Sequence, residues 1–188
     1  MKALLLDWDG TLYDSAKFWK DLPYRYLQSR NIQADENLAK TIESMTVSES
    51  VLYLQKQYDS NITKEDLLAF MEREYTKSVS FFPGVQEGLR QAYQQGILIF
   101  IVTISEETLI QNILNQYHLS DWIEKIYAGS KDTPRLYEDL IQEYSLDKKD
   151  CLVIDDNAKV IDMLHENGWI TELCKDSIKI DKIIKNHL

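Results

Sequence analysis

The chain has 188 residues, of which 44% are hydrophobic and 28% are charged. These proportions are ordinary for a folded globular protein and argue against a disordered chain. The formal net charge of −10 argues against nucleic-acid binding through phosphate attraction. No apolar run approaches the ~20 residues of a membrane span. We therefore expect neither nucleic acid nor a membrane among its partners.

Two features of the sequence concern the compartment. Cys151 and Cys174 form neither a disulfide framework nor a metal-ligand spacing, which fits a reducing environment. The N-terminal apolar run is too short for the core of a signal peptide. We expect a cytoplasmic protein, while the oligomeric state stays unknown from the sequence.

The first predicted strand covers residues 3–6, an apolar run that suits a strand buried on both faces of a parallel sheet. It leads directly into Asp7 and Asp9. In open α/β sheets ligands bind at the carboxyl ends of strands, so both carboxylates would lie at the mouth of a crevice. Two carboxylates on the same side of an extended backbone repel each other unless a cation or a shared proton offsets the charge. The pair therefore indicates a metal site.

A long helical region follows over residues 15–80, with one proline and no glycine. Apolar residues recur there at helical spacing and predict four short helices. Breaks are expected at Asn31 and at residues 59–61, and Thr63 suits the N-cap of the last helix.

Strands and helices alternate in the remainder of the chain, which favours a parallel sheet with right-handed crossovers. The apolar runs predict further strands at residues 97–102, 126–129, 151–154 and 169–173. Helices are expected between them, and a last surface helix is expected over residues 176–188.

The residues that could carry chemistry lie at or just beyond the carboxyl ends of predicted strands: Asp7, Asp9, Thr103, Ser105, Lys131, Asp155 and Asp156. Phosphoryl transfer through an aspartyl-phosphate needs a carboxylate nucleophile, a hard cation, hydroxyl and amide donors, and a proton donor for the leaving alcohol. This set supplies all of them, and Mg²⁺ prefers such oxygen ligands.

The sequence from Asp7 to Leu12 resembles the Asp-x-Asp-Gly-Thr-Leu signature of the haloacid dehalogenase (HAD) superfamily of phosphohydrolases, with Trp8 in place of the usual Phe. The resemblance implies an α/β fold, a doubly wound parallel sheet with a Rossmann-like core and an inserted α-helical cap. The first strand would be central, with the second and fourth beside it. Residues 1–14 and 82–188 would form the core domain, and residues 15–81 the cap domain.

The same resemblance implies roles for individual residues. Asp7 would be the nucleophile and a metal ligand, and Asp9 the general acid/base with its carbonyl on the metal. Thr103 matches the hydroxyl of the second motif. Lys131 matches the lysine of the third, supported by the spacing to Pro134 and Tyr137, although Asp132 replaces the motif's first proline. Phosphate-binding residues would be Trp8, through its backbone amide, with Gly10, Thr11 and Ser105.

The fourth motif departs from the commonest Gly-Asp-x-x-x-Asp form, because Asp155 stands at the glycine and Val160 at the second aspartate. Which of Asp155 and Asp156 binds the metal therefore stays open. Asp156 is favoured by its spacing to Gly168. The pair could also cap a helix N-terminus, which is compatible with a metal role.

The resulting interpretation is an enzyme, a Mg²⁺-dependent phosphatase that hydrolyses a small phosphorylated metabolite through an aspartyl-phosphate. The alternatives are a phosphomutase with the same chemistry and a non-catalytic member that binds a phosphorylated ligand or a partner protein. A dehalogenase is disfavoured because that branch does not need the second aspartate, Asp9. Each residue also has a purely structural interpretation: Lys131 as a surface lysine, or Thr103 as a turn residue bonded to its own backbone.

Overall fold

The computed structural model describes residues 1–43, 45–174 and 180–187. They divide into two compact units, which are described separately below. The α/β unit consists of Met1–Asp14 and Ser80–Leu188, and the helical unit of Ser15–Val79.

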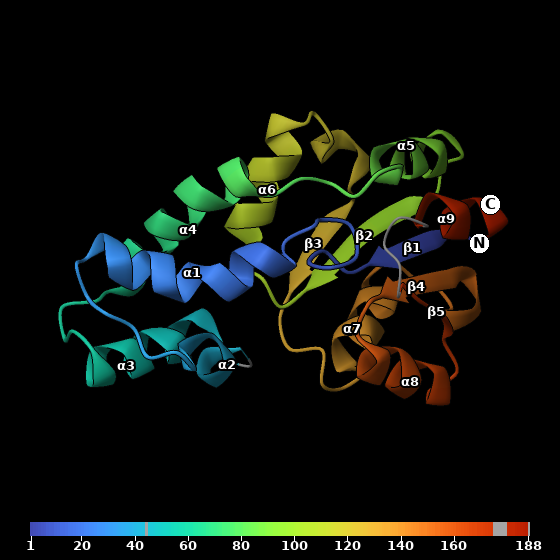
Figure 1. Cartoon of the computed structure of the whole chain (residues 1–188). Helices are drawn as coiled ribbons and strands as arrows, with labels where there is room; N and C mark the ends of the chain where they lie inside the picture. Colours follow the sequence, from blue (N-terminus) through green and yellow to red (C-terminus); the bar gives the residue numbers. More distant parts are fainter. Residues whose placement is uncertain (44, 175–179, 188) are drawn as a thin grey trace. The chain divides into compact units, whose positions relative to one another are not determined.

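A parallel sheet forms the centre of the α/β unit, and in the described residues it has five strands in the order β3-β2-β1-β4-β5 (Figure 1). The strands are β1 (Ala3–Leu6), β2 (Leu98–Thr103), β3 (Lys125–Ala128), β4 (Cys151–Asp155) and β5 (Ile170–Leu173). The predicted order, with the first strand central and the second and fourth beside it, is confirmed. Every residue of β1 is buried, as expected for a strand that is covered on both faces.

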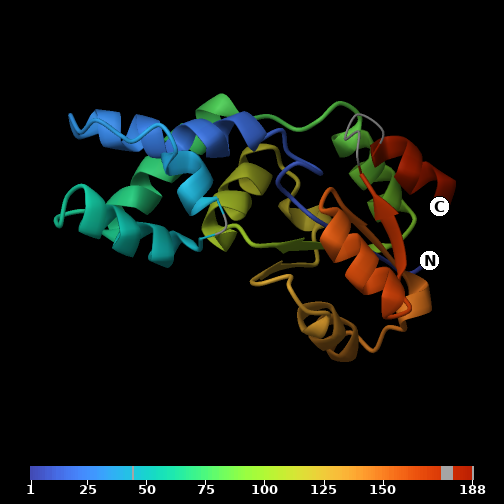
Figure 2. The same ribbon diagram turned by 60° about the horizontal axis from the view of Figure 1, so that its bottom comes forward.

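Helices cover both faces of this sheet. On one face lie α7 (Arg135–Glu143) and α8 (Ala158–Glu166), which come forward in Figure 2. On the other lie α5 (Val85–Gln94), α6 (Glu107–Gln116) and α9 (Ile180–His187) (Figure 1). The short 3-10 helices η1 (Ser120–Trp122) and η2 (Lys148–Asp150) precede β3 and β4. This doubly wound arrangement is the predicted fold class.

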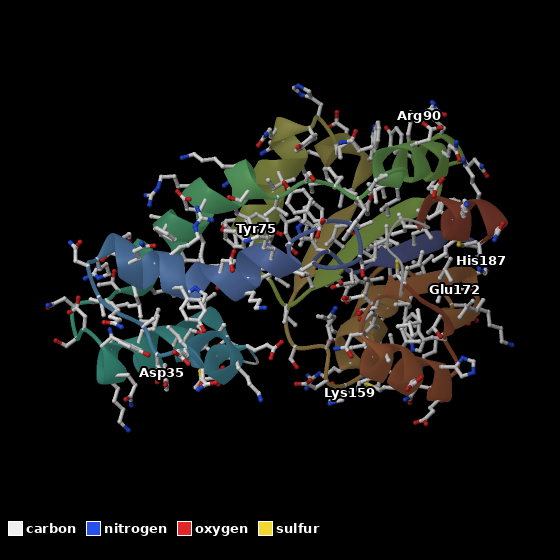
Figure 3. All side chains as sticks on the ribbon, viewed as in Figure 1. Asp35, Tyr75, Arg90, Lys159, Glu172 and His187 are labelled. Carbon is white, nitrogen blue, oxygen red and sulfur yellow. The ribbon has the colours of Figure 1, made fainter. Side chains whose placement is uncertain are left out.

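The predicted tail helix is represented by α9, whereas residues 176–179 and 188 lie outside the described residues. Gly88 of α5 leaves room for α9, since a Cβ there would lie 3.1 Å from Ile184 Cδ1. His187 of α9 approaches Glu172 of β5 at 3.2 Å, and both side chains are labelled in Figure 3. Helix α9 thus packs on α5 and approaches β5.

Four helices make up the described part of the helical unit, in agreement with the sequence: α1 (Ala16–Ser29), α2 (Leu38–Ile42), α3 (Val47–Gln57) and α4 (Lys64–Ser78). The predicted cap of α4 is present, because Thr63 Oγ1 accepts the amide of Asp66 at 3.1 Å. Tyr75 of α4, which is labelled in Figure 3, packs edge-to-face on Phe18 of α1, and the ring centroids are 4.9 Å apart. None of the helices in the described part of the chain combines the length and apolarity needed to cross a bilayer.

The two segments that enter and leave the helical unit are paired by backbone hydrogen bonds. The amide of Asp14 donates to the carbonyl of Ser80 at 2.8 Å, and the amide of Phe82 donates to that of Leu12 at 3.0 Å. These bonds join Ser80 and Phe81 to the α/β unit. The boundary therefore falls after Val79, two residues before the position expected from the sequence.

Candidate active site

Asp7 and Asp155 lie side by side at the carboxyl edge of the sheet. Leu6 of β1 is opposite Ile154 of β4, and the Asp7 amide donates to the Ile154 carbonyl at 3.0 Å. Side chains alternate between the two faces of a sheet along each strand. Asp7 therefore lies on the same face as Leu5, and Asp155 lies on the same face as Val153. Both apolar residues belong to the core cluster beneath α7 and α8. The two carboxylates therefore share that face, although 148 positions separate them.

Lys131 connects them, from the loop between β3 and α7. Its Nζ donates to Asp7 Oδ1 at 2.6 Å and to Asp155 Oδ2 at 2.7 Å. The lysine is only 8% exposed, and Asp7 and Asp155 are 5% and 1% exposed. Interpretation of Lys131 as a surface lysine is thus wrong. Hydrogen bonds from a charged ammonium are stronger than bonds between neutral groups.

Burial and charge set the protonation of these groups. Burial raises the pKa of Asp7 to about 7, although the ammonium of Lys131 opposes the change. Burial by itself would lower the pKa of Lys131, but the carboxylates of Asp7 and Asp155 outweigh it and raise that pKa. Partial loss of contact with water and the charge of Asp155 raise the pKa of Asp156. The site therefore holds more negative charge than one ammonium can neutralise.

Asp7, Asp155 and Asp156 could together hold a metal ion. One oxygen from each lies within 4.8 Å of the others. Asp7 Oδ2 is buried and has no hydrogen-bond partner among the described residues, so Lys131 offsets the charge of this carboxylate through one oxygen only. Three carboxylates suit a hard divalent cation, which would also supply the missing positive charge. The residues present therefore fit a metal.

Asp155 and Asp156 differ in how their oxygens are used. Both oxygens of Asp155 are engaged, Oδ2 by Lys131 and Oδ1 by the amide of Asn157 at 2.8 Å. Asp156 is exposed and lies beside Gly10. Gly10 has a φ of +84°, and a Cβ there would lie 2.9 Å from Asp156 Cγ, with its carboxylate oxygen closer still. Glycine is thus required both by the backbone and by the neighbouring carboxylate.

The loop after β1 closes on itself. The carbonyl of Trp8 accepts the amides of Leu12 and Tyr13, and the amide of Gly10 donates to the carbonyl of Tyr13. Trp8 is fully buried and stacks on Tyr13, with ring centroids 5.2 Å apart. Thr11 is also fully buried, and its Oγ1 has no hydrogen-bond partner in the described part of the chain. The loop after β1 therefore holds a buried hydroxyl oxygen that no described residue contacts by a hydrogen bond.

Thr103 and Ser105 form a turn at the end of β2. The Ser105 amide donates to Thr103 Oγ1 at 3.1 Å, and the Ser105 hydroxyl makes a short hydrogen bond to Asp9 Oδ2. Thr103 is buried at 1% exposure, whereas Ile104 between them is 71% exposed. The turn therefore brings Ser105 into direct contact with Asp9. This agrees with the expectation that residues at the carboxyl ends of β1 and β2 lie close together.

Two features of the site were not anticipated from the sequence. One is the hydrogen bond between Ser105 and Asp9, for which no local pattern exists. The other is the hydroxyl of Tyr137, a residue that served only as a spacing marker. It is fully buried and has no partner among the described residues. Burial raises the pKa of Tyr137; the charge of Lys131 lowers this pKa, and the charge of Asp155 raises it. The spacing of Tyr137 and Leu140 on α7 could have indicated its burial.

Comparison with known proteins agrees with this geometry. The model of the family described as haloacid dehalogenase-like hydrolase matches residues 4–168. Hexitol phosphatase B of Escherichia coli (strain K12) is 21% identical over 170 residues, covering 83% of this chain and 75% of the relative. Phosphoglycolate phosphatase of Nitrosospira multiformis is 25% identical over 174 residues, covering 84% and 75%.

Solved structures show the same fold. A Thermotoga maritima protein assigned as a beta-phosphoglucomutase superposes with a TM-score of 0.77 at 16% identity, with all of both chains covered. The match to the family model spans most of the chain and includes each strand end described above except that of β5. The chain therefore belongs to the haloacid dehalogenase-like hydrolases and is an enzyme of the branch whose named relatives are phosphatases.

Proposed function

We propose that this enzyme is a Mg²⁺-dependent phosphatase that hydrolyses a small phosphomonoester through a phosphorylated Asp7. The observation that carries the proposal is the state of the Asp7 carboxylate. One oxygen is bound by Lys131, while the other is buried without a partner among the described residues. A carboxylate held by one oxygen leaves the second free to attack phosphorus.

The remaining residues fit the needs of that reaction. Asp7 Oδ2 forms a bond to phosphorus as the bond from phosphorus to the ester oxygen breaks, and Asp9 gives the leaving oxygen a proton. Water then attacks phosphorus, Asp9 takes a proton from that water, and Asp7 departs as a carboxylate. Lys131 stays charged throughout and stabilises the negative charge that builds up around Asp7.

The donors for the phosphate oxygens come from the two loops. The hydroxyl of Thr103 accepts the Ser105 amide, which leaves its own proton to be donated. The hydroxyl of Thr11, which lacks a partner in the described ranges, and the amide of Trp8 are the further donors we propose. The amide of Gly10 is engaged by Tyr13, so its contribution is the space that it leaves beside the Asp156 carboxylate.

We propose that the metal is Mg²⁺, held by Asp156, by the carbonyl of Asp9 and by Oδ1 of Asp7, which has a second lone pair besides the one that accepts from Lys131. When bound, it would neutralise charge on the phosphate and on the carboxylates. Asp155, whose two oxygens are already engaged, would instead hold Lys131 in place. This assignment of Asp156 to the metal and of Asp155 to Lys131 agrees with the preference for Asp156 that its spacing to Gly168 gave.

The substrate we propose is a small, polar phosphorylated metabolite. The named relatives act on hexitol phosphates and on phosphoglycolate, in the words of their names. We further propose that residues 15–79 form the cap that selects among such substrates, because the α/β unit by itself already contains the proposed catalytic set. Chemistry and selectivity would then belong to different units.

The test is an assay with p-nitrophenyl phosphate and a panel of phosphorylated polyols and acids, with EDTA or with Mg²⁺. Wild type should turn over only with Mg²⁺, and Asp7→Asn should abolish turnover. Asp121→Asn is the matched control, an exposed aspartate on η1, before β3 and hence at the opposite edge of the sheet. A wild-type enzyme that binds Mg²⁺ by calorimetry but hydrolyses none of the panel would contradict the proposal. Product analysis with sugar phosphates separates hydrolysis from the phosphomutase alternative.

A further inference from the structure

The hydrogen bond between Ser105 and Asp9 joins two loops that are far apart in the sequence. Asp9 belongs to the loop after β1, and Ser105 to the turn after β2, 96 positions later. The hydroxyl of Ser105 donates to Asp9 Oδ2. Since Asp9 is the proposed general acid/base, Ser105 contacts the one group whose orientation decides proton transfer.

The donors of Ser105 are both in use. Its amide donates to Thr103 Oγ1, and its hydroxyl donates to Asp9. A serine has only these two donors, so Ser105 offers none to a phosphate oxygen in this arrangement. The role expected from the sequence, as a phosphate-binding residue, would require the bond to Asp9 to break.

We propose that Ser105 is a positioning residue that acts through Asp9, an inference that rests on the proposed function. Its hydroxyl fixes Oδ2, so that Oδ1 carries the proton. Oδ1 gives that proton to the ester oxygen as the bond to phosphorus breaks, and the electron pair of this bond ends on the protonated alcohol. Oδ1 then takes a proton from the water that attacks phosphorus. Ser105 donates to Oδ2 in both states and loses no proton itself.

Leaving groups of different basicity separate this role from phosphate binding. An alkoxide is a poor leaving group that needs a proton, whereas p-nitrophenolate leaves without one. Positioning of the acid therefore matters for alkyl phosphates and very little for p-nitrophenyl phosphate. A phosphate ligand would matter equally for both, because the transferred group is the same.

The experiment measures kcat and KM of Ser105→Ala for glycerol phosphate and for p-nitrophenyl phosphate. General acid–base help is worth on the order of 10²–10⁴-fold, and we expect a loss of about tenfold or more in kcat with glycerol phosphate. With p-nitrophenyl phosphate the loss should stay below about threefold, and inhibition by inorganic phosphate should be unchanged. Ser105→Thr, which keeps the hydroxyl, should restore most of the glycerol phosphate activity.

A matched control is Ser120→Ala on η1, which removes a hydroxyl that donates to Asn115 Oδ1 at 2.6 Å. It should leave both substrates unaffected. A double variant supplies the second measurement. If Ser105 acts through Asp9, adding Ser105→Ala to Asp9→Asn should cost less than about twofold further with glycerol phosphate.

Three results would overturn the inference. Equal losses on both substrates with weaker phosphate inhibition would make Ser105 a phosphate ligand. Additive losses in the double variant would show that it acts independently of Asp9, and unchanged kinetics would show no role. In each case wild type is active, so the proposed function survives. A wild type inactive towards all phosphomonoesters would instead contradict the proposed function, and this inference with it.

Discussion

Replacing Asp7 by asparagine should abolish turnover and should remove a loss of stability that the metal-free wild type shows as the pH rises. Asparagine has nearly the same shape as aspartate but carries no charge. Burial raises the pKa of Asp7 to about 7 from an ordinary value of 3.8, even with Lys131 as its partner. The ionised carboxylate is therefore costly in the folded state when no metal is bound.

The size and sign of the effect follow from this pKa. A shift of roughly 3 pH units corresponds to about 4 kcal/mol of differential stabilisation. The folded-state pKa lies above the unfolded one, so the contribution of Asp7 is fully present below about pH 4 and is lost as the pH rises through about 7. Integration between pH 5 and 8 gives a loss of about 3 kcal/mol in wild type that Asp7→Asn should not show.

Urea unfolding in EDTA at pH 5, 6, 7 and 8 measures the effect. The two proteins are compared by the change in unfolding free energy between pH 5 and 8, because the absolute difference at any one pH also contains the bond from Lys131 that Asp7→Asn weakens. Asp121→Asn should follow wild type throughout. Mg²⁺ at 100 times its dissociation constant should stabilise wild type by about 2.7 kcal/mol and Asp7→Asn by less. Parallel curves for wild type and Asp7→Asn in EDTA would refute the reasoning.

Three further predictions concern the acidic pair, the glycine and the helical unit. Asp156→Ala should raise the Mg²⁺ concentration for half-maximal activity by about tenfold or more, whereas Asp155→Ala should chiefly lower stability, by about 3 kcal/mol, because it removes a buried partner of Lys131. The opposite pattern in Mg²⁺ titration and urea unfolding would contradict the assignment. Gly10→Ala should cost about 1–3 kcal/mol in unfolding free energy and weaken Mg²⁺ binding in calorimetry, because its methyl group collides with the Asp156 carboxylate. Replacing residues 15–79 by a short flexible linker should change the ranking of kcat/KM among phosphomonoesters but not the Mg²⁺ requirement; a folded variant that keeps the parent ranking would refute the cap proposal.

The fold could be predicted because its signals are local and periodic. Apolar runs ending in polar residues located the strands, and their alternation with helices implied a parallel sheet. The central place of β1 came from the resemblance carried by Asp7, Asp9 and Gly10, and the sheet order agrees with it. Since parallel strands end at the same edge, the meeting of Asp7 and Asp155 also followed from the sequence alone.

The contacts within the site were decided only by the tertiary structure. Nothing in the sequence distinguishes Lys131 from a surface lysine except its spacing to Pro134 and Tyr137, yet it is buried between two carboxylates. Its loop has no periodicity, so its path depends on what β3 and α7 pack against. Asp155, the last residue of β4, holds Lys131, whereas Asp156 follows outside the strand and lies beside Gly10.

The bond from Ser105 to Asp9 has the same origin. A serine two residues after a strand has no local feature that selects its partner, because its hydroxyl can rotate towards any nearby acceptor. The choice is made by the distance between the loops after β1 and β2, which the register of Leu6 opposite Ile101 fixes. The sequence by itself therefore determined which residues meet at this edge of the sheet. The packed loops decided which atoms are bonded, because hydrogen bonds depend on positions within a few tenths of an ångström that no residue pattern encodes.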